Sequence, residues 1–129
     1  MSKEQIKQAV AGYFAGIRHN DKTAWLSHFA LDSISYDPVG GPPHEGHEGL
    51  SKFFDGMNKM FASVSLVEEE IFIAGNEAAV SWRGEIIGKN GRTVTFSGIN
   101  TFVVNDAGKI SLLKAYWSPG AMMKELNKD

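Results

Sequence analysis

A chain of 129 residues without cysteine is long enough to bury one core, so we expect a single domain over residues 1–129 with neither a disulfide nor a thiolate site. Its 13 basic and 15 acidic side chains are interspersed, and the net charge of -2 favours neither nucleic acid nor anionic lipid as a partner. The polar start of the chain lacks a signal-peptide core, and no apolar run is long enough to cross a membrane. We therefore expect a cytoplasmic protein with no membrane or nucleic-acid partner.

The first half of the chain is predicted to be helical. In the first helix, apolar residues recur at steps of three and four and share a face made of Ile6, Val10, Tyr13, Phe14 and Ile17. A short second helix begins near Asp21, a typical N-cap, and buries Trp25, Leu26 and Phe29. After a short β-prone run at residues 34–36, a third helix carries the stripe Leu50, Phe53, Phe54, Met57, Met60 and Phe61.

The second half is predicted to form long strands, over residues 65–74, 77–88, 92–104 and 110–117. Turn residues such as Gly75-Asn76 and Asn90-Gly91 separate them, which is typical of hairpins and favours an antiparallel meander. Helices followed by strands indicate an α+β fold. We expect a cone-shaped, curved antiparallel sheet with about three N-terminal helices on its concave face and an apolar interior.

Asp37 is the first candidate for a functional residue. It follows the β-prone run and precedes a stiff turn, Pro38–Pro43, and the proline holds its backbone out of the helical region. Asp-Pro is also a common way to start a turn, with the carboxylate capping nearby amides. In an apolar cone the carboxylate would instead lose solvation, which raises its pKa toward that of a general base.

Two further polar residues are predicted to point into the core. Asn100 shares an otherwise apolar strand face with Val94, Phe96, Gly98, Phe102 and Val104. A buried amide without partners costs ~1–3 kcal/mol, so Asn100 either bonds a neighbouring loop or donates to a ligand oxygen. Tyr13 is either an ordinary core tyrosine or a hydroxyl donor that reaches into a cavity.

A set of large apolar side chains could line such a cavity, although apolar residues at these spacings more often form plain core. The predicted substrate-binding residues are Phe29, Phe54, Met57, Trp82, Phe96, Phe102 and Trp117. The cluster His44, Glu45, His47 and Glu48 lacks the spacing of a helical zinc motif and is interpreted as a solvated loop. His19 and His28 are predicted at helix surfaces, and we expect no metal and no cofactor.

Over nearly its full length the chain resembles the ketosteroid isomerase-like members of the nuclear transport factor 2-like, SnoaL-like superfamily. The matching stretches are residues 11–14 (AGYF), 28–32 (HFALD), 36–40 (YDPVG), 42–46 (PPHEG), 53–54 (FF), 102–110 (FVVNDAGKI) and 114–117 (KAYW). The resemblance implies a cone of helices on a curved sheet, often dimeric through the sheet.

The resemblance also implies roles for the three polar residues. Asp37 would move a proton between two carbons, and Tyr13 would donate to the developing enolate oxygen. Asn100 stands where those enzymes have a second, protonated aspartate, and Phe29 and Phe54 stand where some members carry supporting tyrosines.

The sequence therefore predicts a steroid Δ-isomerase-like enzyme that acts on a flat apolar ketone, with Asp37 as base and Tyr13 and Asn100 as oxyanion donors. It leaves open a polyketide cyclase or dehydratase that uses the same acid, and a non-catalytic protein that binds an apolar small molecule. The fold alone does not choose among these functions. We expect a homodimer formed through the sheet.

Overall fold

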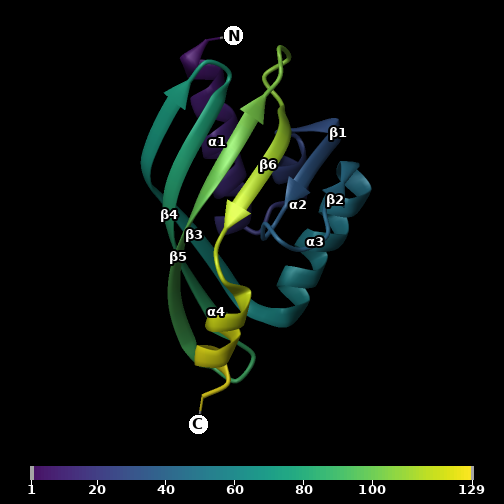
Figure 1. Ribbon diagram of the computed structural model, residues 1–129. Helices are drawn as coiled ribbons and strands as arrows, with labels where there is room; N and C mark the ends of the chain where they lie inside the picture. Colours follow the sequence, from purple (N-terminus) through teal and green to yellow (C-terminus); the bar gives the residue numbers. More distant parts are fainter. Residues whose placement is uncertain (1, 129) are drawn as a thin grey trace.

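The computed structural model describes residues 2–128 and shows a strongly curved sheet with helices on one face (Figure 1). The elements in chain order are α1 (Lys3–Arg18), α2 (Lys22–Leu26), β1 (Phe29–Tyr36), β2 (His44–Glu45), α3 (Gly46–Met60), β3 (Phe61–Ala74), β4 (Glu77–Gly88), β5 (Thr93–Val104), β6 (Ile110–Tyr116) and α4 (Pro119–Leu126). The strands form a six-stranded sheet in the order β2-β1-β6-β5-β4-β3. The predicted α+β architecture is confirmed.

Local sequence signals explain where the helices begin. Ser2 and Gln5 form a capping box at α1, in which the Ser2 hydroxyl accepts from the backbone N–H of Gln5 and the Gln5 side chain accepts from the N–H of Ser2. Asp21 caps α2 as predicted, because its carboxylate accepts from the N–H of Ala24 at 3.1 Å. Ser118 caps α4 in the same way, and Pro119 follows at the start of that helix.

The predicted meander is confirmed for β3 to β6, which pair antiparallel in sequence order. The prediction that the whole sheet is antiparallel is wrong, because β1 pairs with β6 in parallel. Pairing β1 beside β6 brings the turn after β1 next to the end of β6. The residues at these two strand ends become neighbours although they are far apart in sequence.

Some element boundaries and one helix also differ from the prediction. Phe61 begins β3 rather than ending α3; it pairs with Gly88 and packs with Ile86 in a small apolar cluster. Phe29 begins β1 rather than belonging to the second helix. The helix α4 is absent from the prediction, and it buries Met122 and Leu126 in the same cluster as Phe61. In Figure 1, α4 lies at the lower end of the sheet.

The main core lies between the sheet and helices α1 to α3. The predicted face of α1 is buried, with Ile6, Val10 and Phe14 at 0% exposure. The predicted inward face of β5 is also confirmed, since Val94, Asn100, Phe102 and Val104 are buried. Complete burial of a large side chain stabilises the fold by ~1.5–3 kcal/mol, so these two faces hold helix and sheet together.

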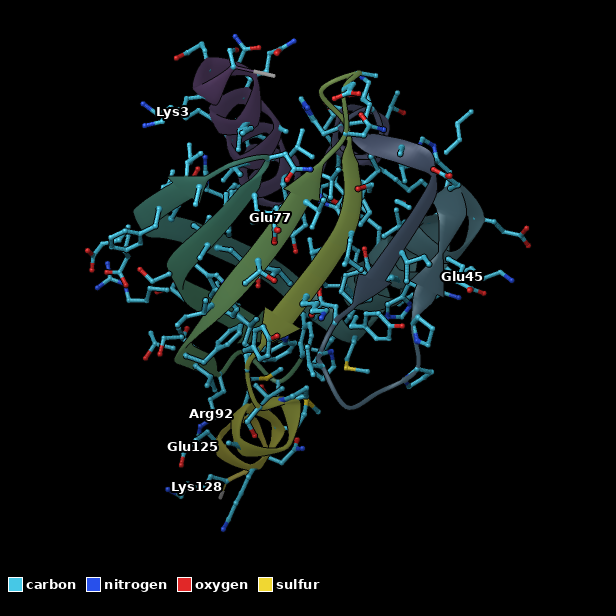
Figure 2. The ribbon with its side chains drawn as sticks, turned by 45° about the horizontal axis from the view of Figure 1, so that its top comes forward. Lys3, Glu45, Glu77, Arg92, Glu125 and Lys128 are labelled. Carbon is cyan, nitrogen blue, oxygen red and sulfur yellow. The ribbon has the colours of Figure 1, made fainter. Side chains whose placement is uncertain are left out.

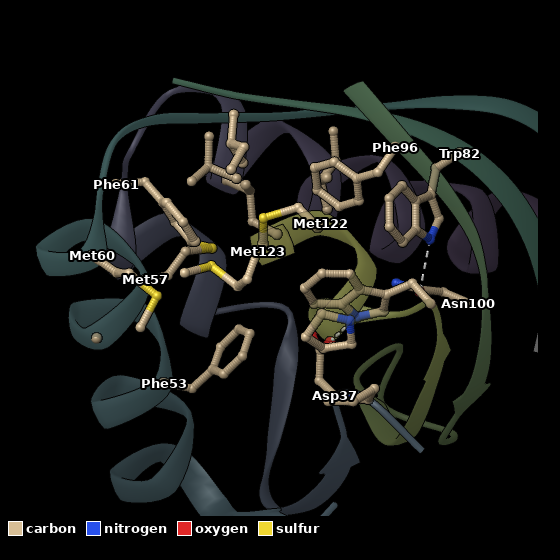
Figure 3. A pocket seen from close by; sticks show the side chains of 18 of the residues that line it. Asp37, Phe53, Met57, Met60, Phe61, Trp82, Phe96, Asn100, Met122 and Met123 are labelled. Atoms are coloured by element: carbon tan, nitrogen blue, oxygen red, sulfur yellow. Dashed lines mark hydrogen bonds between the residues drawn. The ribbon is translucent and has the colours of Figure 1, made fainter. Parts of the chain in front are cut away.

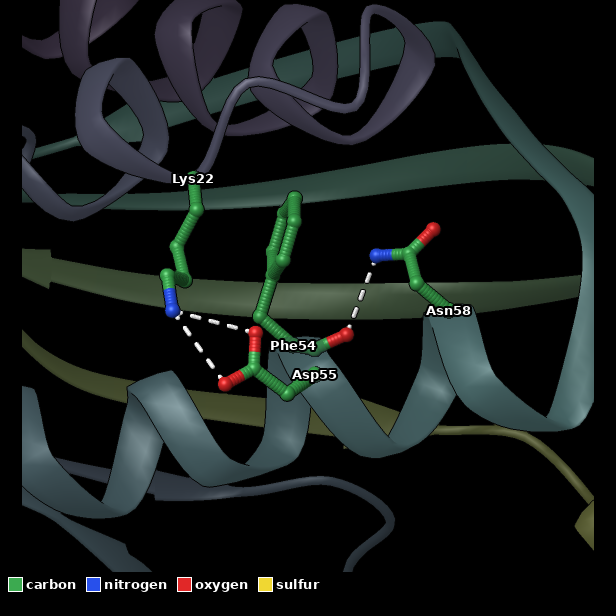
Figure 4. A network of polar contacts seen from close by, with 4 residues as sticks. All are labelled: Lys22, Phe54, Asp55 and Asn58. Carbon is green, nitrogen blue, oxygen red and sulfur yellow. Dashed lines mark hydrogen bonds and ion pairs between the residues drawn. The ribbon is translucent and has the colours of Figure 1, made fainter.

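Polar side chains form hydrogen bonds and ion pairs at the surface, outside this core. The Lys22 ammonium lies 3.0 Å from the Asp55 carboxylate and links α2 to α3, and the Asn58 amide donates to the carbonyl of Phe54 one turn earlier (Figure 4). Because both charges are substantially exposed, such a pair contributes about 1 kcal/mol or less. Figure 2 shows charged side chains of both signs at the periphery, including Lys3, Glu77 and Arg92. Within residues 2–128, no helix is long and apolar enough to span a membrane.

Candidate active site

A cavity of about 490 Å³ opens between α3, α4 and the concave face of the sheet (Figure 3). Its wall is almost entirely apolar. The lining residues are Tyr13, Ile17, Asp37, Pro38, Lys52, Phe53, Gly56, Met57, Met60, Phe61, Val64, Leu66, Trp82, Ile86, Phe96, Asn100, Trp117, Pro119, Met122 and Met123. The three polar residues predicted from the sequence thus border one cavity, although they come from α1, the end of β1 and β5.

Asp37 is held in place by the turn that follows it and by a residue from the far end of the chain. The N–H of Val39 donates to the carbonyl of Ala115 at 2.9 Å, which ties the turn to β6. The indole N–H of Trp117 donates to Oδ1 of Asp37 at 2.8 Å. The carboxylate therefore bonds a side chain across the cavity wall, and the described contacts do not show it capping the amides of its own turn.

Burial raises the pKa of Asp37 above its usual value, while the hydrogen bond from Trp117 and the electrostatic effect of the nearby His44 act in the opposite direction. Desolvation is the largest of these effects because the cavity wall offers few polar groups to replace water. A carboxylate that is expensive to keep charged is a stronger base than one in water. This is the electrostatic setting expected of a group that accepts a proton.

Tyr13 is buried among aromatic rings and is one of the residues that line the cavity. Its ring meets those of Phe14 and Phe102 edge to face, with centroids 5.0 and 5.3 Å away. Burial and the negative charge of Asp37 raise the pKa of Tyr13 well above its usual value, and the neighbouring Asn100 amide lowers it in part. The phenol therefore keeps its proton at neutral pH and is available as a donor.

Asn100 is 1% exposed and its two amide atoms have different surroundings. Oδ1 accepts a hydrogen bond from the indole N–H of Trp82 at 2.8 Å. Nδ2 is buried with no hydrogen-bond partner assigned to it among the described residues. A buried donor without a partner is costly, and at the wall of a cavity it is a donor that a ligand oxygen could satisfy.

A family model described as a SnoaL-like domain matches residues 10–113. The chain belongs to the SnoaL-like domain family. The resemblance noted from the sequence is thereby confirmed, and the fold fits the nuclear transport factor 2-like superfamily. No curated protein gives a significant sequence match.

Solved structures share the fold of this SnoaL-like domain. TerC, co-crystallised with polyporic acid, has a TM-score of 0.85 at 19% identity, covering 96% of this chain and 99% of TerC. A Mycobacterium tuberculosis protein in complex with estradiol-17β-hemisuccinate has a TM-score of 0.82 at 24% identity, covering 92% and 96%. The Δ5-3-ketosteroid isomerase from Mycobacterium sp. has a TM-score of 0.77 at 25% identity, covering 88% and 93%.

Not all the predicted substrate-binding residues of the SnoaL-like domain reach the cavity. Met57, Trp82, Phe96 and Trp117 line it. The remaining three, Phe29, Phe54 and Phe102, do not border it and pack in the buried core instead. The spacing of apolar residues along a helix or strand predicts which face of the element is buried. It does not distinguish side chains packed in the core from side chains that line a cavity.

Three of the histidines predicted at solvated or surface positions, His28, His44 and His47, are partly buried and contact neighbouring residues. His44 is half-buried, with its ring centroid 4.8 Å from that of Phe53, and it lowers the pKa of Asp37 in part. The ring of His47 bonds the carbonyl of Phe29 at 2.9 Å. His28 lies against Gly12, and burial lowers its pKa. Among residues 2–128, no group of three or more acidic or histidine side chains is arranged to hold a metal.

Several lining residues are missing from the sequence prediction. Those on α4 are Pro119, Met122 and Met123, and those on β3 are Phe61, Val64 and Leu66. A signal for α4 was present in the sequence, since Ser118-Pro119 is a typical helix start and Met122 and Leu126 are one turn apart. No comparable signal marks Val64 or Leu66, because their role depends on the curvature of the sheet.

Proposed function

We propose that this SnoaL-like protein is a steroid Δ-isomerase-like enzyme that shifts a double bond in a flat apolar ketone by proton transfer. One observation carries the proposal: a carboxylate with a raised pKa and two hydrogen-bond donors, Tyr13 and Asn100, border a single apolar cavity. An apolar cavity with a few polar groups suits an apolar ligand that carries one polar function. The solved structures with an estradiol derivative and of a ketosteroid isomerase support a steroid-like substrate.

The proposed reaction uses one group as both base and acid. The Asp37 carboxylate takes a proton from the carbon next to the carbonyl, and the electrons of that C–H bond form a carbon–carbon double bond while the carbonyl oxygen becomes an enolate. The enolate oxygen accepts hydrogen bonds from the Tyr13 hydroxyl and the Asn100 amide. The electrons then return, and protonated Asp37 gives its proton to the carbon two positions further along. Substrate and product are isomers, and the enzyme is regenerated.

The electrostatics of the three groups favour this sequence of steps. Desolvation makes Asp37 readier to accept a proton, and the raised pKa of Tyr13 keeps the phenol protonated as a donor. The Asn100 amide does not titrate, so its donor strength is independent of pH. Holding substrate, base and donors in one dry site replaces solvent reorganisation by fixed geometry.

The test is isomerisation of a β,γ-unsaturated 3-ketosteroid to its conjugated isomer, followed by ultraviolet absorbance. Asp37→Ala is expected to abolish the reaction above background. Asp32→Ala is the matched control, because Asp32 also lies on β1 but is exposed. Equal rates for wild type and Asp37→Ala would contradict the proposal.

Membership of the SnoaL-like family also favours a second candidate, a polyketide cyclase- or dehydratase-like enzyme that uses the same Asp37. Product analysis on a panel of apolar ketones separates the two, since an isomerase moves a double bond without forming a ring, a cyclase forms a new ring and a dehydratase loses water. A non-catalytic binding protein is the third candidate. It predicts that Asp37→Asn leaves ligand affinity unchanged and that no ketone of the panel is converted.

We further propose that two copies associate through the outer face of the sheet. Val67, Ile99 and Tyr116 on that face are 46%, 49% and 46% exposed, and Ile99 lies opposite Tyr116 across β5 and β6. Sedimentation velocity is expected to show a dimer for the wild type and a monomer for Ile99→Glu. A wild-type monomer at micromolar concentration would overturn this proposal.

A further inference from the structure

Trp82 makes a hydrogen bond that fixes which way the Asn100 amide faces. The indole N–H can only donate, so the amide atom 2.8 Å from it must be the acceptor Oδ1. The NH₂ group of Asn100 is then turned away from Trp82, and it has no hydrogen-bond partner assigned in the described chain. Figure 3 shows this hydrogen bond at the wall of the cavity.

The strand register explains how the indole reaches Asn100. On β4 and β5, Val80 lies opposite Asn100 and Trp82 lies opposite Gly98, so Trp82 and Asn100 are diagonal neighbours on the inward face. A Cβ on Gly98 would lie 2.5 Å from Cζ2 of Trp82. Only a residue without a side chain leaves room for the indole to lie over this part of β5.

The indole is also confined on its other sides. Its ring meets that of Phe96 edge to face, with centroids 5.5 Å apart and an interplanar angle of 86°, and the Trp117 ring lies 6.3 Å away. Trp82 is 2% exposed. Since neighbours hold the ring and the ring holds Oδ1, the donor direction of Asn100 is set before any ligand binds.

Among the described residues, the indole N–H of Trp82 makes the one side-chain hydrogen bond assigned to the Asn100 amide, so its loss frees the amide to turn over. Asn100 and Tyr13 line the same cavity, and the amide lowers the pKa of the tyrosine. A reversed amide would present Oδ1 to the Tyr13 hydroxyl and occupy its proton. One lost hydrogen bond would then remove two donors from the ligand oxygen.

We propose that Trp82 is a positioning residue that locks the Asn100 amide with its NH₂ toward the cavity, and so makes this end of the cavity selective for ligands that carry a carbonyl oxygen. The inference rests on the proposed function in taking the ligand to be a ketone. Trp82 acts through Asn100, so its effect depends on the presence of the amide.

The experiment compares the affinities of two ligands of similar shape, 2-acetylnaphthalene, which has a carbonyl, and 2-isopropylnaphthalene, which has none, by isothermal titration calorimetry. Trp82→Phe is expected to lower the ratio of ketone to hydrocarbon affinity about three- to tenfold, as for loss of a neutral hydrogen bond. Changes in packing affect both ligands and cancel in the ratio. In an Asn100→Leu background the ratio is already low, and adding Trp82→Phe is expected to lower it no further.

The inference would be overturned by a Trp82→Phe variant that binds both ligands more weakly by the same factor, or by a ratio that falls equally in the Asn100→Leu background. Circular dichroism checks that the variants fold. Replacement of Trp82 by β-(3-benzothienyl)alanine keeps the ring and removes only the N–H; it is expected to give the same fall, and an unchanged ratio overturns the inference. Because binding alone is measured, a wild type that isomerises no ketone contradicts the proposed function and leaves this test intact.

Discussion

Replacing Asp37 by asparagine is expected to change activity and stability in opposite directions. The amide has nearly the shape of the carboxylate, and its Oδ1 can still accept the hydrogen bond that Trp117 makes to Asp37 at 2.8 Å. The geometry of the site is therefore kept, while the base is lost. General base catalysis typically contributes about 10²–10⁴ in rate, and we expect the isomerisation rate of Asp37→Asn to fall by at least this factor.

The same substitution is expected to stabilise the fold at neutral pH. Burial raises the pKa of Asp37, which means that the folded state holds the proton more tightly than the unfolded state does. At a pH below the ordinary carboxyl pKa, Asp37 is protonated in both the folded and the unfolded state and does not lower the free energy of unfolding. As pH rises past that value the unfolded chain ionises first, so the wild type loses stability until Asp37 ionises in the folded state as well.

The stability gain has the sign of the desolvation effect, which the bond from Trp117 offsets in part, and each pKa unit of difference between the two states corresponds to about 1.4 kcal/mol. Urea unfolding of wild type and Asp37→Asn measures it at neutral pH and near pH ~3, below the ordinary carboxyl pKa, where the difference should vanish. A variant that is inactive but less stable than the wild type at neutral pH would refute the desolvation argument. A variant as active as the wild type would refute the role of Asp37 as base.

Three further predictions test the remaining parts of the site. Tyr13→Phe is expected to slow isomerisation by about 10²–10³ while leaving the affinity for a hydrocarbon ligand unchanged in calorimetry; an equal loss for hydrocarbon and ketone would assign Tyr13 to packing alone. Gly98→Ala places a Cβ 2.5 Å from the Trp82 ring and 2.7 Å from the carbonyl oxygen of Tyr116, so it is expected to destabilise by about 1–3 kcal/mol in urea unfolding, whereas Gly120→Ala meets no atom within 4 Å and serves as control. Phe102→Ala removes a side chain that is 0% exposed and should cost about 3–5 kcal/mol in stability, whereas Phe96→Ala, at the cavity wall, should cost less stability and more ligand affinity; the reverse order would contradict the division into core and cavity wall.

Local signals were sufficient for most of the fold. The stripe on α1, the Asp21 cap and the hairpin turns each act within a few residues, and the structure confirms them. The errors lie where distant segments decide the outcome. The parallel pairing of β1 with β6 joins Tyr36 to Lys114, and Phe61 leaves the helix because it packs with Ile86 and Met122.

The candidate site divides in the same way. Alternation along β5 is enough to place Asn100 on the buried face, and helical spacing is enough to place Tyr13 inward. The same rules place Phe102 and Phe54 inward, but neither reaches the cavity. The spacing of apolar residues along a helix or strand shows which face of the element a side chain lies on. Whether that side chain packs against another side chain or borders a cavity depends on how far apart the packed elements lie.

The sequence by itself therefore determined the class of fold, the family resemblance and the three polar residues that face inward. Only the tertiary structure decided how they are held. The indole of Trp117 reaches Asp37 across 80 residues, and that of Trp82 reaches Asn100 across 18. These hydrogen bonds form because the curved sheet brings strand ends and diagonal neighbours side by side. A hydrogen bond depends on a distance of ~3 Å between two atoms, and no pattern in the sequence predicts that distance for residues far apart along the chain.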